Sequence, residues 1–159
     1  MKHGGVRRRR DAVRENPERG VSAIEFVFLT PVLFFLIFAT VQFAVYFFAR
    51  HVAIAAAQEG ARVARAEAGN PAEDWSGDAK AKAVVWINQL APSLLKSNCG
   101  NGPTTACVST GNSGAPGAAG WTVSVTVTAN VPSLIPGVNM SVTETSTGPV
   151  EQFIPDPGN

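Results

Sequence analysis

The stretch "RGVSAIEFVFLTPVLFF", from Arg19 to Phe35, joins a basic leader to a long apolar run and places one carboxylate, Glu25, at the start of that run. A charged side chain in the centre of a bilayer costs about 2.5 to 3.5 kcal/mol or more. An acidic residue at this place is therefore a functional candidate.

The apolar run extends from Phe26 to Ala49 without a charged residue. At about 1.5 Å per residue, a helix of this length reaches roughly 36 Å, which is enough for a hydrocarbon core near 30 Å. The run is apolar on all sides, unlike a surface amphipathic helix. It predicts a single membrane span.

The charge distribution predicts the orientation of this span. Lys and Arg cluster before it, so the positive-inside rule places the N terminus in the cytoplasm and the C-terminal part on the extracytoplasmic side. A cleaved secretory signal is the main alternative, but the apolar run is too long for one. The basic run from Arg7 to Arg10 has no aromatic residues or folded module around it, so we expect no nucleic-acid partner.

The first helix is expected to continue beyond the membrane, from about Val21 to Ala68, because the following segment is rich in Ala and ends in Gly69. Small residues recur at four-residue spacing at Ala56, Gly60 and Ala64. This spacing favours close packing against another helix. An Ala-rich composition also produces it by chance, and the sequence leaves the two explanations open.

A second helix is predicted to begin at Asn70, with Pro71 in its first turn and Glu73 three residues after the cap. Apolar residues then recur at three- and four-residue steps, as on the core face of a helix. These residues are Trp75, Ala79, Ala83, Trp86, Leu90 and Leu94.

The rest of the chain predicts a small antiparallel sheet. Residues 97–120 have the composition of a loop, in which residues 107–109 are a candidate short strand. Alternating apolar residues over 121–131 and 138–142 predict two strands, and "SLIPG" between them predicts a turn. The expected fold class is α+β, with a long transmembrane helix, an amphipathic second helix and a small antiparallel β-sheet in a pilin-like layout.

Cys99 and Cys107 are the only cysteines and bracket the loop "CGNGPTTAC". On the extracytoplasmic side a disulfide is the leading interpretation, with free thiols or a metal site as alternatives. A four-ligand metal site needs further ligands, but on the predicted topology His3 lies across the membrane and His51 lies at its surface. The chain contains no HExxH, CxxC, GxxxxGK[ST] or GxSxG motif, so we expect no enzyme, metal or cofactor.

The junction itself suggests proteolytic processing. Gly20 offers a protease an unhindered bond, and cleavage between Gly20 and Val21 would create a charged amine one helical turn from Glu25. In a packed array of helices, the carboxylate of one chain would pair with the amine of a neighbour.

The region resembles the TadE-like proteins, on "GVSAIEFVFLTPVLFFLIF" and on "AAAQEGARVARA" with Glu59, Gly60, Ala61 and Arg62. The resemblance implies a non-enzymatic minor pilin or pseudopilin of the tight adherence (Flp pilus) system in the bacterial cell membrane. It implies a prepilin peptidase, other pilins and the tight adherence secretion apparatus as partners. It implies that Gly20 and Val21 flank the cleaved bond, with Glu25, Phe26 and Pro31 acting in recognition and helix packing.

The expected organisation has three parts: a basic leader at 1–20, a TadE-like helical region at 21–69 and a small extracytoplasmic α+β domain at 70–159. The alternative function is an uncleaved single-pass anchor that presents a small binding module. In that case Glu25 is an interfacial residue without a partner.

Overall fold

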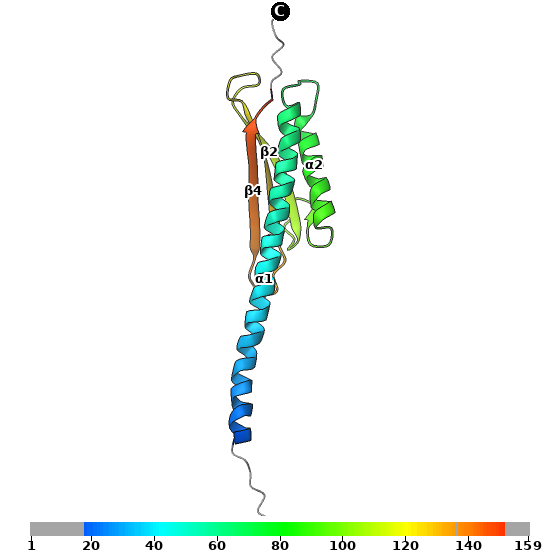
Figure 1. The fold of residues 1–159 in the computed structure, drawn as a ribbon. Coiled ribbons are helices and arrows are strands. Elements are labelled where there is room, and N and C mark those ends of the chain that lie inside the picture. Colours follow the sequence, from blue (N-terminus) through cyan, green and yellow to red (C-terminus); the bar gives the residue numbers. More distant parts are fainter. Residues whose placement is uncertain (1–17, 136, 152–159) are drawn as a thin grey trace, which may run out of the picture. The chain divides into compact units, whose positions relative to one another are not determined.

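The computed structural model describes residues 18–135 and 137–151 (Figure 1). The leader residues 1–17 lie outside the described part. The elements are α1 (Glu18–Glu67), α2 (Trp75–Leu90), β1 (Lys96–Ser97), β2 (Thr105–Ser113), β3 (Thr122–Val131) and β4 (Met140–Pro149).

The chain divides into two compact units, residues 1–37 and residues 38–159, and the boundary lies within α1. The described part of the first unit is the beginning of α1. The second unit, here called the sheet domain, contains the rest of α1, together with α2 and the four strands.

The sheet has the strand order β1-β2-β3-β4. The three long strands are antiparallel neighbours, with Val127 of β3 opposite Val108 of β2 and Glu144 of β4. The sequence predicts the antiparallel pairing of β3 with β4, but not the long strand β2. The two-residue strand β1 adds a parallel edge, which makes the sheet mixed. The connection from β2 to β3 lies at one end of the sheet, and the connection from β3 to β4 lies at the other.

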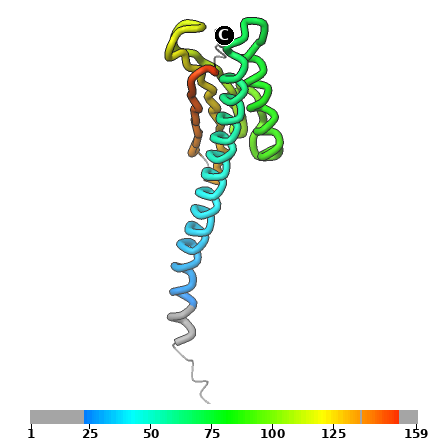
Figure 2. Tube along the Cα trace, turned by 45° about the horizontal axis from the view of Figure 1, so that its top comes forward, coloured from blue at the N-terminus to red at the C-terminus, as the bar shows by residue number. Residues whose placement is uncertain are grey.

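The two helices cover one face of the sheet (Figures 1 and 2). Val123, Val125 and Val127 of β3 alternate toward the helices and are completely buried, as period-two patterning requires. The opposite face carries hydroxyl side chains, which pair across the strands: the hydroxyls of Thr126 and Thr145 lie 2.8 Å apart. The domain is therefore a two-layer α+β structure with one core.

The structure corrects the predicted start of the second helix. It begins at Trp75, and the carboxylate of Asp74 caps it by accepting a hydrogen bond from the Gly77 amide at 3.1 Å. The Asn70 side chain accepts from the Ala72 amide at 3.1 Å, but this closes a local turn and no helix follows.

The buried face of α2 also differs from the prediction. Ala79, Ala83 and Ile87 form it at strict four-residue spacing, although Ile87 was not among the predicted residues. Leu90, at the last position of the helix, is 42% exposed, and Leu94 lies beyond the end of the helix.

The prediction of a loop over residues 97–120 was wrong in its middle part. The strand β2 occupies Thr105–Ser113 and pairs with β3 over eight residue positions. Its Gly, Ser and Asn residues have low intrinsic strand preference, so its formation depends on pairing with β3 rather than on local sequence. The predicted short strand at residues 107–109 is the centre of this longer one.

Candidate functional site: the long helix α1

The first unit exposes the apolar side chains of α1 on all sides. Phe26, Phe28 and Phe35 are 70%, 72% and 69% exposed. α1 is long and apolar enough to cross a membrane. Glu25 is exposed at its start and makes no ion pair with any side chain that the structure describes.

The proposed processing site lies in the first turn of α1, which begins at Glu18. The backbone amides of Gly20 and Val21 are among the first four of the helix, which have no partner within it. The side chains of residues 18–22 lie outside the described part.

Pro31 lies inside α1 and is exposed, so it is not part of the core in the described part of the chain. The neighbouring Thr30 hydroxyl donates to the Phe26 carbonyl at 2.6 Å. The polar group of Thr30 is thereby satisfied by the backbone, as a hydrocarbon environment requires.

The second part of α1 is seated in the sheet domain by small residues. Ala56, Gly60 and Ala64 are all buried, so the predicted close packing is present. A Cβ atom at Gly60 would lie 2.9 Å from the Ala79 carbonyl oxygen of α2 and 3.1 Å from Val125 of β3. Gly60 therefore allows α1 to approach both the second helix and the sheet.

The "EGAR" motif divides between surface and core. Glu59 and Arg62 form an ion pair at 2.9 Å on the exposed side, while Gly60 and Ala61 are buried. Exposed pairs of this kind contribute little to stability. The motif therefore contributes to the packing of the core mainly through its two small residues, Gly60 and Ala61.

Gln42 of α1 bonds to the connection between β3 and β4 within the sheet domain, and the sequence did not predict this contact. Its side chain is 5% exposed. The amide nitrogen donates to the Pro132 carbonyl at 3.2 Å and to the Met140 sulfur at 3.3 Å, and the amide oxygen accepts from the Leu134 backbone at 2.8 Å. The sequence feature that could have indicated this role is that Gln42 is the one amide side chain in the run from Phe26 to Ala49.

Arg50 and Glu144 connect α1 to β4 through a hydrogen-bonded ion pair at 2.8 Å. This hydrogen bond and the charge of Glu144 raise the pKa of Arg50 above its ordinary value. Both side chains remain partly exposed, so the pair serves alignment more than stability.

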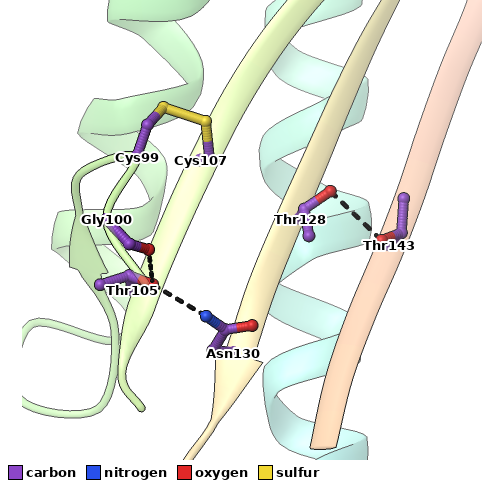
Figure 3. Close-up of a disulfide and its surroundings, with 7 residues drawn as sticks. All are labelled: Cys99, Gly100, Thr105, Cys107, Thr128, Asn130 and Thr143. Atoms are coloured by element: carbon purple, nitrogen blue, oxygen red, sulfur yellow. Dashed lines mark hydrogen bonds between the residues drawn. A yellow bond between two sulfur atoms is a disulfide. The ribbon is translucent and has the colours of Figure 1, made fainter. Parts of the chain in front are cut away.

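The predicted disulfide is present: Cys99 and Cys107 are bonded, and they close the loop before β2 (Figure 3). The Thr105 hydroxyl donates to the Gly100 carbonyl at 2.7 Å, and the Asn130 amide donates to that hydroxyl at 3.0 Å. The loop is thus fixed to β2 by the disulfide and to β3 by Asn130.

The far end of α1 carries an ionisable group in an unfavourable setting. Burial raises the pKa of Glu67, and the charges of Asp78 and Glu73 raise it further. One of its carboxylate oxygens is buried and has no hydrogen-bond partner. In the described ranges, no three His, Cys, Asp or Glu side chains gather closely enough to hold a metal ion.

The family model described as TadE-like protein matches residues 20–62. Comparison with curated proteins and with solved structures gave no match. The match begins at Gly20 and ends at Arg62, so it covers the apolar run, Gln42 and the buried small residues Ala56 and Gly60, but not Ala64. Residues 20–62 of this chain are therefore a TadE-like segment.

Proposed function

We propose that this protein is a membrane-anchored, non-enzymatic subunit of the tight adherence pilus system, acting as a minor pilin or pseudopilin. The observation that carries the proposal is the TadE-like match over an exposed apolar helix that continues into the core of a small domain. Such a helix has one part available to a membrane or to other helices, and another part that carries a folded module.

Glu25 is the residue on which the assembly role depends. It is exposed at the start of the apolar run. Its burial in a bilayer or in a helix array is costly without a cation. In our proposal a prepilin peptidase cuts after Gly20, and the new amine of Val21 in a neighbouring subunit supplies that cation.

The Glu25→Ala variant tests this role in a piliated bacterium that carries the gene. We expect a loss of surface pili, because the variant lacks the acceptor for the amine. The matched control is Glu73→Ala, which removes an exposed carboxylate from the sheet domain and should leave piliation unchanged. Normal piliation in the Glu25→Ala strain would favour the alternative, an uncleaved anchor that presents a binding module.

The cleavage step is tested separately by intact-mass measurement of the protein extracted from membranes. We expect a mass that lacks residues 1–20. A mass that retains Met1 to Gly20 would overturn processing, while leaving membrane anchoring in place.

A further inference from the structure

We propose that the loop between β3 and β4, through its described residues 132–135 and 137–139, is immersed in the lipid interface of the bilayer that α1 crosses. The sheet domain would then contact the membrane through this loop as well as through its helix. The inference rests on the membrane anchoring in the proposed function, and the partner that it names is the lipid surface.

The loop exposes apolar side chains where a water-facing turn would carry polar ones. Leu134, Ile135 and Val138 are 53%, 41% and 42% exposed. The loop contains no charged residue. Grouped apolar exposure of this kind marks a membrane or protein contact.

Gln42 places the loop beside the apolar part of α1 within the sheet domain. Its side chain bonds to Pro132 and Leu134 of the loop. A hydrocarbon core about 30 Å thick takes about 20 helical residues. Counted from Phe26, the first residue of the uncharged apolar run, those residues end at Val45, three residues after Gln42. The loop is therefore bonded to α1 at the edge of the hydrocarbon.

Few charged residues lie at the end of the sheet domain that carries the β3–β4 loop. Between Lys96 and Glu144 the sequence contains no Asp, Glu, Lys, Arg or His. Arg50 lies about 12 Å along the helix from Gln42, and its partner Glu144 lies about 13 Å along β4 from Met140. The ion pair between them is thus the first charged layer on both elements.

Lys96 is the charged residue closest to the loop on the other edge of the sheet. It pairs in register with Thr105, whose hydroxyl bonds to Asn130. Its side chain is exposed, and a lysine at this level is suited to contact lipid phosphates. Within the sheet domain, the acidic residues of α1 are Glu59 and Glu67, and both follow Arg50 in the chain. Glu67 lies close enough to Asp78 and Glu73 for their charges to raise its pKa.

A cavity of about 520 Å³ separates the loop from the disulfide loop. Asn101, Gly102 and Pro103 line one side, and residues from 130 to 141 line the other. The lining is uncharged and rich in backbone and amide groups, which suits the polar but weakly charged environment at the level of the lipid glycerol.

A bilayer explains the exposed side chains better than a second copy of the chain does. A stable protein interface buries about 800 Å² on each partner. Three exposed apolar side chains on one loop supply only part of that area. A lipid interface does not need a protein surface that is complementary in shape. It also lies at the level where α1 enters the bilayer in the proposed function.

The test measures the depth of a spin label in the full chain, reconstituted in vesicles of phosphatidylethanolamine and phosphatidylglycerol. The variant Leu134→Cys is labelled with a nitroxide while Cys99 and Cys107 remain oxidised. The measured quantity is the ratio of the label's collision rate with oxygen, which dissolves in lipid, to its collision rate with a water-soluble nickel chelate. We expect this ratio to be several-fold higher for the label at Leu134→Cys than for a label at Ala118→Cys. Ala118 is exposed in the loop at the opposite end of the sheet.

Phe35→Cys provides the reference for the apolar helix, and Val138→Cys repeats the measurement within the loop. If Phe35 is in lipid and both loop labels are in water, the loop proposal is overturned and anchoring stands. If the label at Phe35 is also in water, anchoring and the proposed function fail together. A loop label shielded from both reagents, and released when the protein is diluted in lipid, would show that a second copy covers the loop and would overturn the proposal.

Discussion

At the scale of single residues, Gln42 is the polar contact with the largest expected effect on stability. Gln42→Leu keeps the side chain near its original size but leaves the Leu134 amide and the Pro132 carbonyl without their partner. A buried polar group left unsatisfied costs about 1 to 3 kcal/mol, so we expect a loss of that order in the free energy of unfolding.

The measurement is chemical unfolding of the detergent-solubilised full chain, followed by tryptophan fluorescence. Trp75, Trp86 and Trp121 all lie in the sheet domain, so the signal reports that domain. Gln58→Leu is the matched control, since Gln58 is exposed on the same helix and its change should stay within about 0.5 kcal/mol. Equal effects of the two variants would refute the role given to Gln42.

Glu67 gives the domain a predictable response to pH. Its pKa is raised in the folded state above the ordinary value of 4.5, so the folded protein holds this proton more tightly than the unfolded chain. The stabilising contribution of the protonated form is complete below pH 4.5 and is lost as the pH rises through the folded pKa.

We therefore expect Glu67→Gln to raise the midpoint of thermal unfolding at pH 7, because the variant removes a charge that folding disfavours. The difference should shrink toward zero below about pH 4.5. Thermal melts of both proteins across this pH range provide the check, and Glu151→Gln serves as the control for a carboxylate that is exposed. A stabilisation independent of pH would exclude the charge of Glu67 as its cause.

At the scale of elements, the disulfide is the covalent support for the start of β2. The loop that it closes spans residues 99–107, and the chain-entropy model assigns such a closure about 2 to 3 kcal/mol. We expect the double variant Cys99→Ser, Cys107→Ser to lose that amount in the free energy of unfolding. Denaturant unfolding of the oxidised parent, the reduced parent and the double variant makes the measurement. A variant as stable as the oxidised parent would show that Asn130 and the β2 pairing fix the loop without the bond.

The elements that the sequence predicts well are those with a strong internal pattern. α1 follows from an uninterrupted apolar run and an Ala-rich extension, and β3 follows from strict alternation of Val with Thr and Ser. β2 has neither pattern, because its strand conformation is supplied by the register with β3. The start of α2 was misplaced because Asn70 and Asp74 are both good cap residues, and only Asp74 precedes the helix.

At the scale of the whole molecule, the candidate site also contains residues that local sequence patterns predict and contacts that only the structure shows. Glu25, Gly60 and the two cysteines follow from local patterns of charge, small residues and spacing. The contacts of Gln42 and of Arg50 join residues about ninety positions apart, so no local pattern contains them. The sequence therefore predicts the helix and its membrane span. The contacts between this helix and the strands within the sheet domain are known only from the structure.

The alanine face of α1 has a mechanical consequence. Methyl groups such as those of Ala53, Ala57 and Ala61 let the helix lie close to the sheet, but they present a smooth surface with few projections to resist sliding along the helix axis. Longitudinal position is then fixed by polar contacts along the contact face: Gln42 with the β3–β4 loop, Arg50 with Glu144, and the Arg65 carbonyl with the Glu151 amide. Under a pull along the helix, these polar contacts are expected to yield before the apolar face separates.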